Sequence, residues 1–149
     1  MTSEVVPFLR THTHLTIITN ALNVGWGVAQ QHQGHPLHML GGQVEQDWGI
    51  YGDSDALRNI RVDWTILEAG GLDAERGITH DDRNYANMAR ALFALSAQVI
   101  VLIAPENLGR TGALFIASAS EVDILITGRE APNPPLWDLS ELGMRIVLA

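Results

Sequence analysis

DWTILEAGG at residues 63–71 is a short apolar run followed directly by two glycines. Short runs rich in Val, Ile and Leu are typical of buried parallel strands, because both faces of such strands are covered. Strands of this kind that alternate with helical segments predict an α/β fold with a mostly parallel sheet. Five similar runs recur along the chain: LTIIT (15–19), PLHML (36–40), QVIVLIA (98–104), VDILIT (122–127) and MRIVLA (144–149).

The segments between these runs carry helix signals, namely capping residues, prolines and apolar residues at helical spacing. No repeat, low-complexity tract or linker interrupts the pattern, so residues 1–149 are expected to form a single domain. Four helices are expected: one capped by Asn20 and ending near Gln31, a short one beginning at Asp53 and Ser54, one after Asp81 and Asp82, and one opened by Pro134 and Pro135 and ended by Gly143.

Composition excludes several classes of chemistry. The chain contains no cysteine and no lysine, which rules out thiolate catalysis, cysteine-ligated metals, disulfides and Schiff-base formation. Its net charge of −8 disfavours direct contact with DNA, since affinity for nucleic acid comes mainly from cationic side chains. The sequence shows neither an apolar stretch of membrane-spanning length nor a signal-peptide pattern, so we expect no membrane contact and a cytoplasmic location.

In an open parallel sheet, ligands bind beyond the carboxyl ends of the strands. Glycine pairs directly after strands let a ligand approach the backbone and expose amide N–H groups, which hold phosphate or carboxylate oxygens. Each pair also fits a plain turn at a strand end, and that alternative stays open. The residues that follow the runs are Thr19-Asn20, Gly41-Gly42, Gly70-Gly71, the segment 105–110 and Thr127-Gly128.

Consecutive blocks of the sequence resemble the effector-sensing domain of DeoR-type bacterial transcriptional regulators. The resemblance implies a three-layer fold like that of ribose-phosphate isomerase and glucosamine-phosphate deaminase. It also implies a non-catalytic domain that senses phosphorylated sugars or related metabolites, forms a homo-oligomer, and reaches DNA through an N-terminal helix-turn-helix that this chain lacks. The blocks are LTIITNALNV (15–24), HPLHMLGG (35–42), RVDWTILEAGGLDAERGIT (61–79), LIAPENLGR (102–110) and SEVDILIT (120–127).

The resemblance and the strand-end positions together predict one small-molecule effector site. Its expected ligand is a phosphorylated sugar or a related metabolite, bound by backbone amides and one guanidinium. The predicted ligand-binding residues are Asn20, Gly41, Gly42, Gly70, Gly71, Thr79, Asn107 and Arg110.

Departures from the family pattern lower the expected affinity for phosphate. The family's first strand and phosphate-holding loop are expected to be missing, apart from a tail at Thr2-Ser3. Tyr85 and Ala89 stand where the family usually has a glutamate and a lysine, and the residues at 104–107 replace an Asp-Ser-Ser-Lys sequence. Lost cations remove charge-assisted hydrogen bonds, for which Arg90 and Arg110 compensate only in part. We therefore expect phosphosugar sensing to be weakened, altered or lost.

Two other functions stay open. A sugar-phosphate isomerase or deaminase-like enzyme needs a carboxylate base, and Glu68, Asp81 and Glu106 are the candidates near strand ends. A ligand-free oligomerisation domain needs only an apolar interface. Because no convincing nucleophile–base pair is present and a fold does not determine its function, the sequence favours a sensor over an enzyme.

The histidines do not predict a metal site. His32, His35 and His38 are spaced at three residues, but Pro36 and the alternation of a strand separate their rings, so we expect neither metal nor cofactor. The run at 80–82 places a histidine beside two aspartates. Its expected role is to start a helix, with acid–base chemistry as the alternative.

Overall fold

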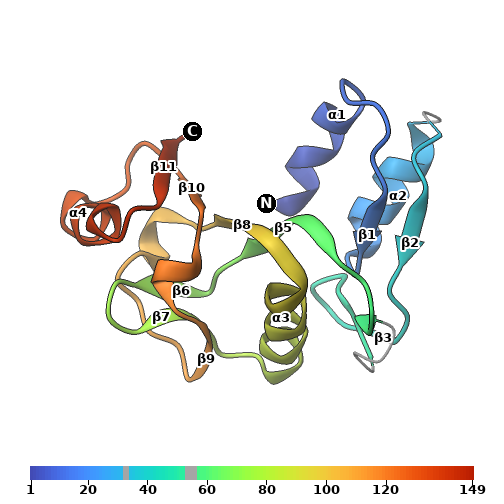
Figure 1. Ribbon diagram of the computed structural model, residues 1–149. Helices are drawn as coiled ribbons and strands as arrows, with labels where there is room; N and C mark the ends of the chain where they lie inside the picture. The colour runs from blue at the N-terminus through green and yellow to red at the C-terminus, as the bar shows by residue number, and fades with distance from the viewer. Residues whose placement is uncertain (32–33, 53–56) are drawn as a thin grey trace. The chain divides into compact units, whose positions relative to one another are not determined.

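The computed structural model describes residues 1–31, 34–52 and 57–149, which form two compact units, Met1–Arg58 and Asn59–Ala149 (Figure 1). Each unit has its own strands and its own buried apolar cluster. The helix predicted at Asp53 and Ser54 begins outside the described residues.

The first unit packs helices against a small parallel sheet. β1 pairs with β2 in parallel, with Ile17 opposite Leu37, and β3 pairs with β4 in antiparallel orientation. Val6, Val24 and Val28 form its buried cluster, so the N-terminal helix packs its apolar side against α2. The elements are η1 (Thr2–Val5), α1 (Val6–Leu9), β1 (Ile17–Thr19), α2 (Leu22–Gln30), β2 (Leu37–Met39), β3 (Gln43–Val44) and β4 (Ile50–Tyr51).

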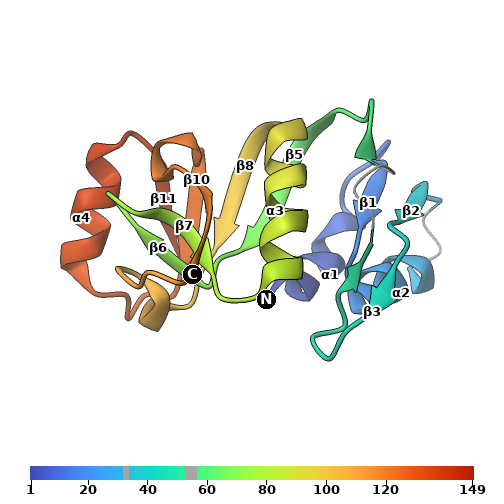
Figure 2. The same ribbon diagram turned by 90° about the horizontal axis from the view of Figure 1, so that it is seen from below.

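The second unit contains a parallel sheet in the order β11-β10-β8-β5 and an antiparallel sheet in the order β6-β7-β9. Figures 1 and 2 show the four parallel strands side by side, with α3 alongside β8 and α4 beside β11. The elements are β5 (Val62–Glu68), β6 (Gly71–Asp73), β7 (Gly77–His80), α3 (Arg83–Leu95), β8 (Ser96–Leu102), η3 (Pro105–Asn107), β9 (Leu114–Ala117), η4 (Ala119–Glu121), β10 (Ile124–Thr127), α4 (Asn133–Glu141) and β11 (Arg145–Leu148).

The core of the second unit lies on one face of its parallel sheet. Leu67, Val101 and Leu125 are in register across β5, β8 and β10, and all three are buried. They belong to the same cluster as the buried alanines of α3 and the leucines of α4. The alternate side chains of these strands, such as Ile66 and Ile100, are only half-buried. One face of the sheet therefore holds the helices and fixes where the strand ends lie.

All six predicted strands form, with ends within two residues of the predicted ones. They divide into the β1-β2 pair of the first unit and the four parallel strands of the second. The antiparallel β6-β7-β9 sheet was not predicted. Its strands are three or four residues long, and Gly71 and Gly77 in two of them look like turn residues in the sequence.

The predicted helix ends are right for α3 and α4, and for α2 the end near Gln31 is right but the capping residue is wrong. The Asp82 carboxylate accepts a hydrogen bond from the Tyr85 N–H at 2.7 Å and caps α3, as expected. Gly143 follows α4 with φ of +89°, a conformation that glycine adopts easily. In α2 the capping position is Ala21, because the Asn20 side chain instead donates to the Ile50 carbonyl at 3.4 Å.

Candidate functional site

The carboxyl ends of the neighbouring strands β5 and β8 are connected through the segments that follow them. Gly70 lies between β5 and β6, Gly71 is the first residue of β6, and η3 comes after β8. Downstream of η3, the Gly109 N–H donates to the Leu72 carbonyl at 2.8 Å. This contact brings residues 110–113, here called the Arg110 loop, beside the glycine pair.

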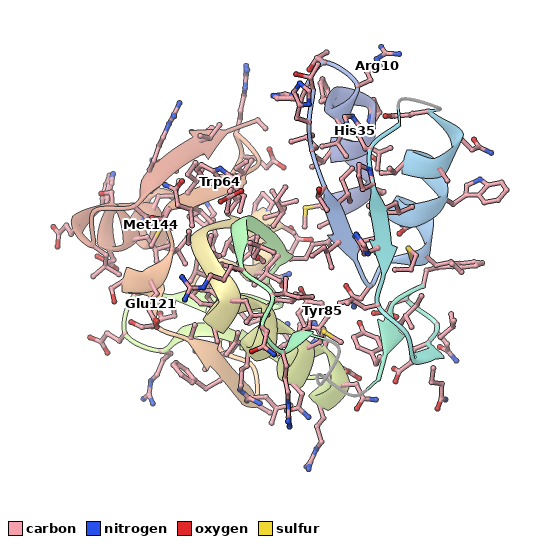
Figure 3. The ribbon with its side chains drawn as sticks, turned by 45° about the vertical axis from the view of Figure 1, so that its right-hand side comes forward. Arg10, His35, Trp64, Tyr85, Glu121 and Met144 are labelled. Atoms are coloured by element: carbon pink, nitrogen blue, oxygen red, sulfur yellow. The ribbon has the colours of Figure 1, made fainter. Side chains whose placement is uncertain are left out.

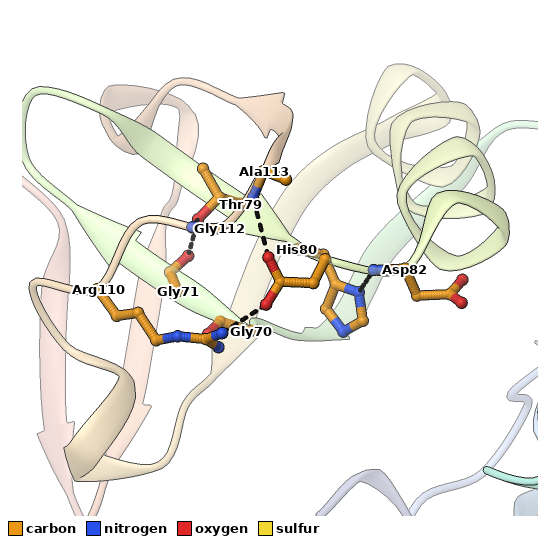
Figure 4. Close-up of polar contacts among 9 residues, drawn as sticks. Gly70, Gly71, Thr79, His80, Asp82, Arg110, Gly112 and Ala113 are labelled. Carbon is orange, nitrogen blue, oxygen red and sulfur yellow. Dashed lines mark hydrogen bonds and ion pairs between the residues drawn. The ribbon is translucent and has the colours of Figure 1, made fainter.

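The Arg110 guanidinium contacts two other segments of the second unit (Figure 4). Its Nη1 donates to the Gly70 carbonyl at 2.7 Å, and its Nη2 pairs with Oδ2 of Asp81, directly after β7. The side chains of Arg110 and Asp81 are 47% and 54% exposed. The ion pair is therefore open to solvent and to exchange with dissolved anions.

Two backbone N–H groups of the Arg110 loop bond to side chains at the end of β7. The Gly112 N–H donates to Oγ1 of Thr79 at 2.8 Å, and the Ala113 N–H donates to Oδ1 of Asp81 at 2.9 Å (Figure 4). The Thr79 hydroxyl is buried and donates in turn to the Gly71 carbonyl at 3.4 Å. The loop is thus attached to β7 by one buried and one exposed side chain.

Electrostatics keep Asp81 ionised. The hydrogen bond from the Ala113 backbone N–H, followed by the hydrogen bond from Arg110, lowers the pKa of the Asp81 carboxyl below its ordinary value of 3.8. Both donors stabilise the charged form, which accepts more strongly than the neutral acid. At neutral pH the carboxylate is an anion held by a guanidinium and a main-chain N–H.

The glycine pair at 70–71 lets these segments approach one another closely. A Cβ at Gly71 would lie 2.4 Å from the Arg110 carbonyl oxygen and 2.8 Å from the Thr79 hydroxyl. A Cβ at Gly70 would lie 2.7 Å from Cδ2 of His80. Close backbone approach is therefore why this position after β5 needs glycine.

The run at 80–82 divides its side chains among three tasks. Nδ1 of His80 accepts from the Asp82 N–H at 3.0 Å, and its ring stacks on Tyr85 at 4.2 Å. Asp82 caps the helix, as predicted, and Asp81 faces Arg110. From the sequence, Asp81 is predicted to belong to a helix start. Its contact with Arg110, 29 residues away, cannot be predicted from the neighbouring residues.

Tyr85, which departs from the resemblance, and Arg90, which was expected to compensate in part for the lost cations, both have structural contacts. The Tyr85 hydroxyl, labelled in Figure 3, donates to the Glu68 carbonyl and accepts from the Glu68 N–H at 3.1 Å, which ties α3 to the end of β5. Nε of Arg90 donates to the Phe115 carbonyl at 2.7 Å. Arg90 therefore holds β9, and Arg110 is the arginine beside the glycine pair.

Other strand-end residues contribute main-chain or buried groups. The Asn107 carbonyl accepts from the Arg110 N–H at 3.3 Å and so supports the turn into the Arg110 loop. Thr127, at the carboxyl end of β10, is 3% exposed, and its hydroxyl has no hydrogen-bond partner among the described residues. Buried hydroxyls are normally paired, which makes Thr127 an unusual group at this edge of the sheet.

The predicted ligand residues of the first unit lie around β4. Asn20 holds the Ile50 carbonyl, and Gly42 adopts φ of +149°, where a Cβ would lie 2.2 Å from the Tyr51 carbonyl oxygen. Gly41 is exposed, and a Cβ there would meet no atom of the described residues within 4 Å. The structure joins Gly70, Gly71, Thr79, Asn107 and Arg110 in one unit and Asn20, Gly41 and Gly42 in the other.

The described residues contain no cluster of three or more histidine or acidic side chains placed to hold a metal ion. His35, labelled in Figure 3, lies just before β2, while His32 lies outside the described residues. Within the described ranges, no helix has the length and apolar character needed to cross a membrane.

Comparison with known proteins then decides the family. A family model described as the DeoR C-terminal sensor domain matches residues 1–129. The chain belongs to this family. The match extends through both compact units, up to the segment just after β10.

Curated relatives of this sensor domain are transcriptional repressors. The chain is 26% identical to the putative aga operon transcriptional repressor of Escherichia coli O157:H7, over 99% of the chain and 55% of the relative. It is 29% identical to the glycerol-3-phosphate regulon repressor of Escherichia coli K12, over 85% of the chain and 50% of the relative. A repressor of the same name from Haemophilus influenzae is 27% identical to the chain, over 92% of the chain and 54% of the relative. The chain spans about half the length of the curated relatives it matches.

Proposed function

We propose that this sensor domain binds an anionic small-molecule effector at the carboxyl ends of β5 and β8, with Arg110 as the principal charged contact. The observation that carries the proposal is the Arg110 guanidinium, which lies exposed beside the Gly70 carbonyl at the sheet edge where ligands bind in open α/β folds. Arginine is planar and permanently charged, and it binds the oxygens of carboxylates and phosphates in pairs. The proposed site consists of Gly70, Gly71, Thr79, Asn107 and Arg110, with Asn20, Gly41 and Gly42 as further candidates.

The effector class follows from the relatives and from the chemistry of the site. Two relatives are repressors of a glycerol-3-phosphate regulon, which supports a phosphorylated metabolite as the effector. The chain has no lysine, and Tyr85 and Ala89 replace charged residues of the family pattern. One guanidinium in place of several cations favours weak binding, in the millimolar rather than the micromolar range.

The domain arrangement is proposed from the extent of the family match. One family model spans both compact units, which supports a single sensor domain over residues 1–149. We propose a three-layer fold of the isomerase and deaminase type, in which α3 and α4 form the layer on the buried face of the four parallel strands.

Action on DNA is proposed for the whole protein. The repressor relatives support control of transcription by the whole protein. We propose that the whole protein is a cytoplasmic homo-oligomer that contacts DNA through a segment outside this domain. A chain with net charge −8 and no lysine is a poor direct ligand for DNA. An effector that prefers one arrangement of the sensor domains would shift the population of DNA-binding states.

The contacts of two candidate catalytic bases, Asp81 and Glu68, favour sensing over catalysis. Asp81 pairs with Arg110 and has a lowered pKa, which makes it a weak proton acceptor. Glu68 lies at the end of β5 with its backbone held by Tyr85. The relatives that are repressors support the same conclusion.

Calorimetric titration of the purified chain with glycerol 3-phosphate, ribose 5-phosphate and inorganic phosphate tests the proposal, with glycerol and ribose as uncharged controls. We expect weak, saturable binding of the phosphorylated compounds that is lost in Arg110→Gln. Micromolar binding would contradict the weakened phosphate site. Equal binding by wild type and Arg110→Gln, or no binding by either, would contradict an effector site at Arg110.

A further inference from the structure

Arg110 is occupied from within the chain by a carboxylate whose two oxygens have different partners. Oδ2 of Asp81 pairs with the guanidinium, and Oδ1 accepts the Ala113 N–H at 2.9 Å. A guanidinium and a main-chain N–H that converge on two oxygens of one group form an anion-binding arrangement. A phosphate or carboxylate group of an effector also carries two oxygens, which can accept hydrogen bonds from the same guanidinium and main-chain N–H.

We infer that Asp81 is an internal competitor, whose carboxylate takes the place at Arg110 and Ala113 that an anionic group of the effector occupies when it binds. The inference rests on the proposed effector site and adds the residue that sets its affinity. Exposure supports exchange, since both side chains are about half exposed and an anion from solution can reach them without unfolding of the core.

Displacement of Asp81 also provides a structural consequence of binding. The Arg110 loop is attached to β7 at two points, the Ala113–Asp81 bond and the Gly112–Thr79 bond. The Thr79 contact is buried, so it persists when Asp81 leaves. Exchange of the exposed contact alone therefore changes what holds the loop that leads into β9 (Leu114–Ala117). Two alternative partners for one loop are the two states that a population shift requires.

The chain offers a matched pair of substitutions for the test. Asp81→Asn removes the competing charge but keeps an oxygen that can accept from Ala113. Asp82→Asn removes the same charge one residue away, and asparagine replaces aspartate well at the capping position that Asp82 occupies. Both variants change the net charge equally, so their difference isolates the contact with Arg110.

The probe is inorganic phosphate, titrated by calorimetry into wild type, Asp81→Asn, Asp82→Asn and the double variant Asp81→Asn/Arg110→Gln. We expect Asp81→Asn to bind about tenfold more tightly than wild type and Asp82→Asn within about twofold of it, since long-range charge effects are screened by salt. The double variant should lose the gain. Asp81→Ser, which also lacks the charge and retains an acceptor, should repeat the result.

Each other outcome overturns the inference. Equal gains in Asp81→Asn and Asp82→Asn would show a general charge effect, and weaker binding by Asp81→Asn would make Asp81 part of the ligand site. Wild-type binding that is lost in Arg110→Gln but not strengthened in Asp81→Asn or Asp81→Ser would overturn the competition while leaving the proposed function in place. Absence of binding by all variants, and by wild type with the phosphorylated metabolites, would overturn both.

Discussion

Gly70-Gly71 and Gly41-Gly42 occupy equivalent places in the sequence, since each pair comes shortly after a parallel strand, yet their surroundings differ. The pair at 70–71 lies against the Arg110 carbonyl, the Thr79 hydroxyl and the His80 ring. In the pair at 41–42, Gly42 packs on the Tyr51 carbonyl and Gly41 has open space around it. The comparison shows that a glycine pair after a strand marks close backbone approach, and that the approaching segment decides whether a charged site results.

The largest expected effect is that of Gly71→Ala. The new methyl carbon would lie 2.4 Å from the Arg110 carbonyl oxygen and 2.8 Å from the Thr79 hydroxyl oxygen. Both distances are shorter than van der Waals contact, so the Arg110 loop must move. We expect a loss of about 1–3 kcal/mol of unfolding free energy, typical of an overpacked site, together with loss of phosphate binding. Thermal unfolding and calorimetry measure the two effects, and a variant with wild-type stability and binding would contradict the packing described.

Two buried threonines allow a test of the hydrogen bonds beside Gly71, because one takes part in them and the other does not. Thr79 and Thr127 are both 3% exposed, but only Thr79 has hydrogen-bond partners for its hydroxyl among the described residues. Thr79→Val leaves the Gly112 N–H unpaired and should cost about 1–3 kcal/mol. Thr127→Val should cost less than about 0.5 kcal/mol. Chemical denaturation of the two variants gives the difference, and equal losses would show that the Thr127 hydroxyl has a partner.

Tyr85→Phe tests how the end of β5 is held before the glycines. The substitution removes both hydrogen bonds between the hydroxyl and the Glu68 backbone but keeps the ring that stacks on His80. We expect a loss of about 1 kcal/mol in unfolding free energy. A fully stable variant in urea denaturation would show that stacking alone positions α3.

Acid stability reports on the ion pair beside the same glycines. Because the folded pKa of Asp81 is lowered, its stabilising contribution is present above the ordinary value of 3.8 and is lost as pH falls through the lower folded value. Asp81→Asn should therefore be less stable than wild type at neutral pH and converge with it at the acid end. Arg110 and, to a smaller extent, His80 are the basic neighbours that contribute to the lowered pKa. If the stability of wild type and of Asp81→Asn differed by the same amount at all pH values, the Arg110–Asp81 ion pair would make no pH-dependent contribution to stability.

The smallest expected effect is that of Gly41→Ala. Within the part of the chain that the structure describes, no atom lies within 4 Å of the added methyl, so the unfolding free energy should change by less than about 0.5 kcal/mol. If Gly41 nonetheless contacts the effector, the variant binds glycerol 3-phosphate more weakly while its melting temperature is unchanged. A large loss of stability would contradict the open surroundings of Gly41.

The sequence predicts long and periodic features well. The runs at 98–104 and 63–69 form β8 and β5 because Val, Ile and Leu favour a strand that buries alternate side chains in the core. The spacing after Asp82 gives α3. These features depend on local pattern and burial, which are present in any short window of the chain.

Features that depend on distant contacts were missed. Two adjacent aspartates follow β7, and no local signal tells which one caps α3 and which one pairs with Arg110. The β6-β7-β9 sheet is short and glycine-containing, so its strands look like turns. Asn20 was expected to cap α2, but the Ile50 carbonyl, thirty residues away in the sequence, binds its amide instead.

Backbone amide NMR of the chain with added glycerol 3-phosphate tests the central claim most directly. If the effector binds at Arg110, the amide signals of Gly70, Gly71, Gly112 and Ala113 shift together and saturate, and Arg110→Gln abolishes these shifts. Saturable shifts that leave these four amides unchanged, or that persist in Arg110→Gln, would contradict an effector site at the carboxyl ends of β5 and β8.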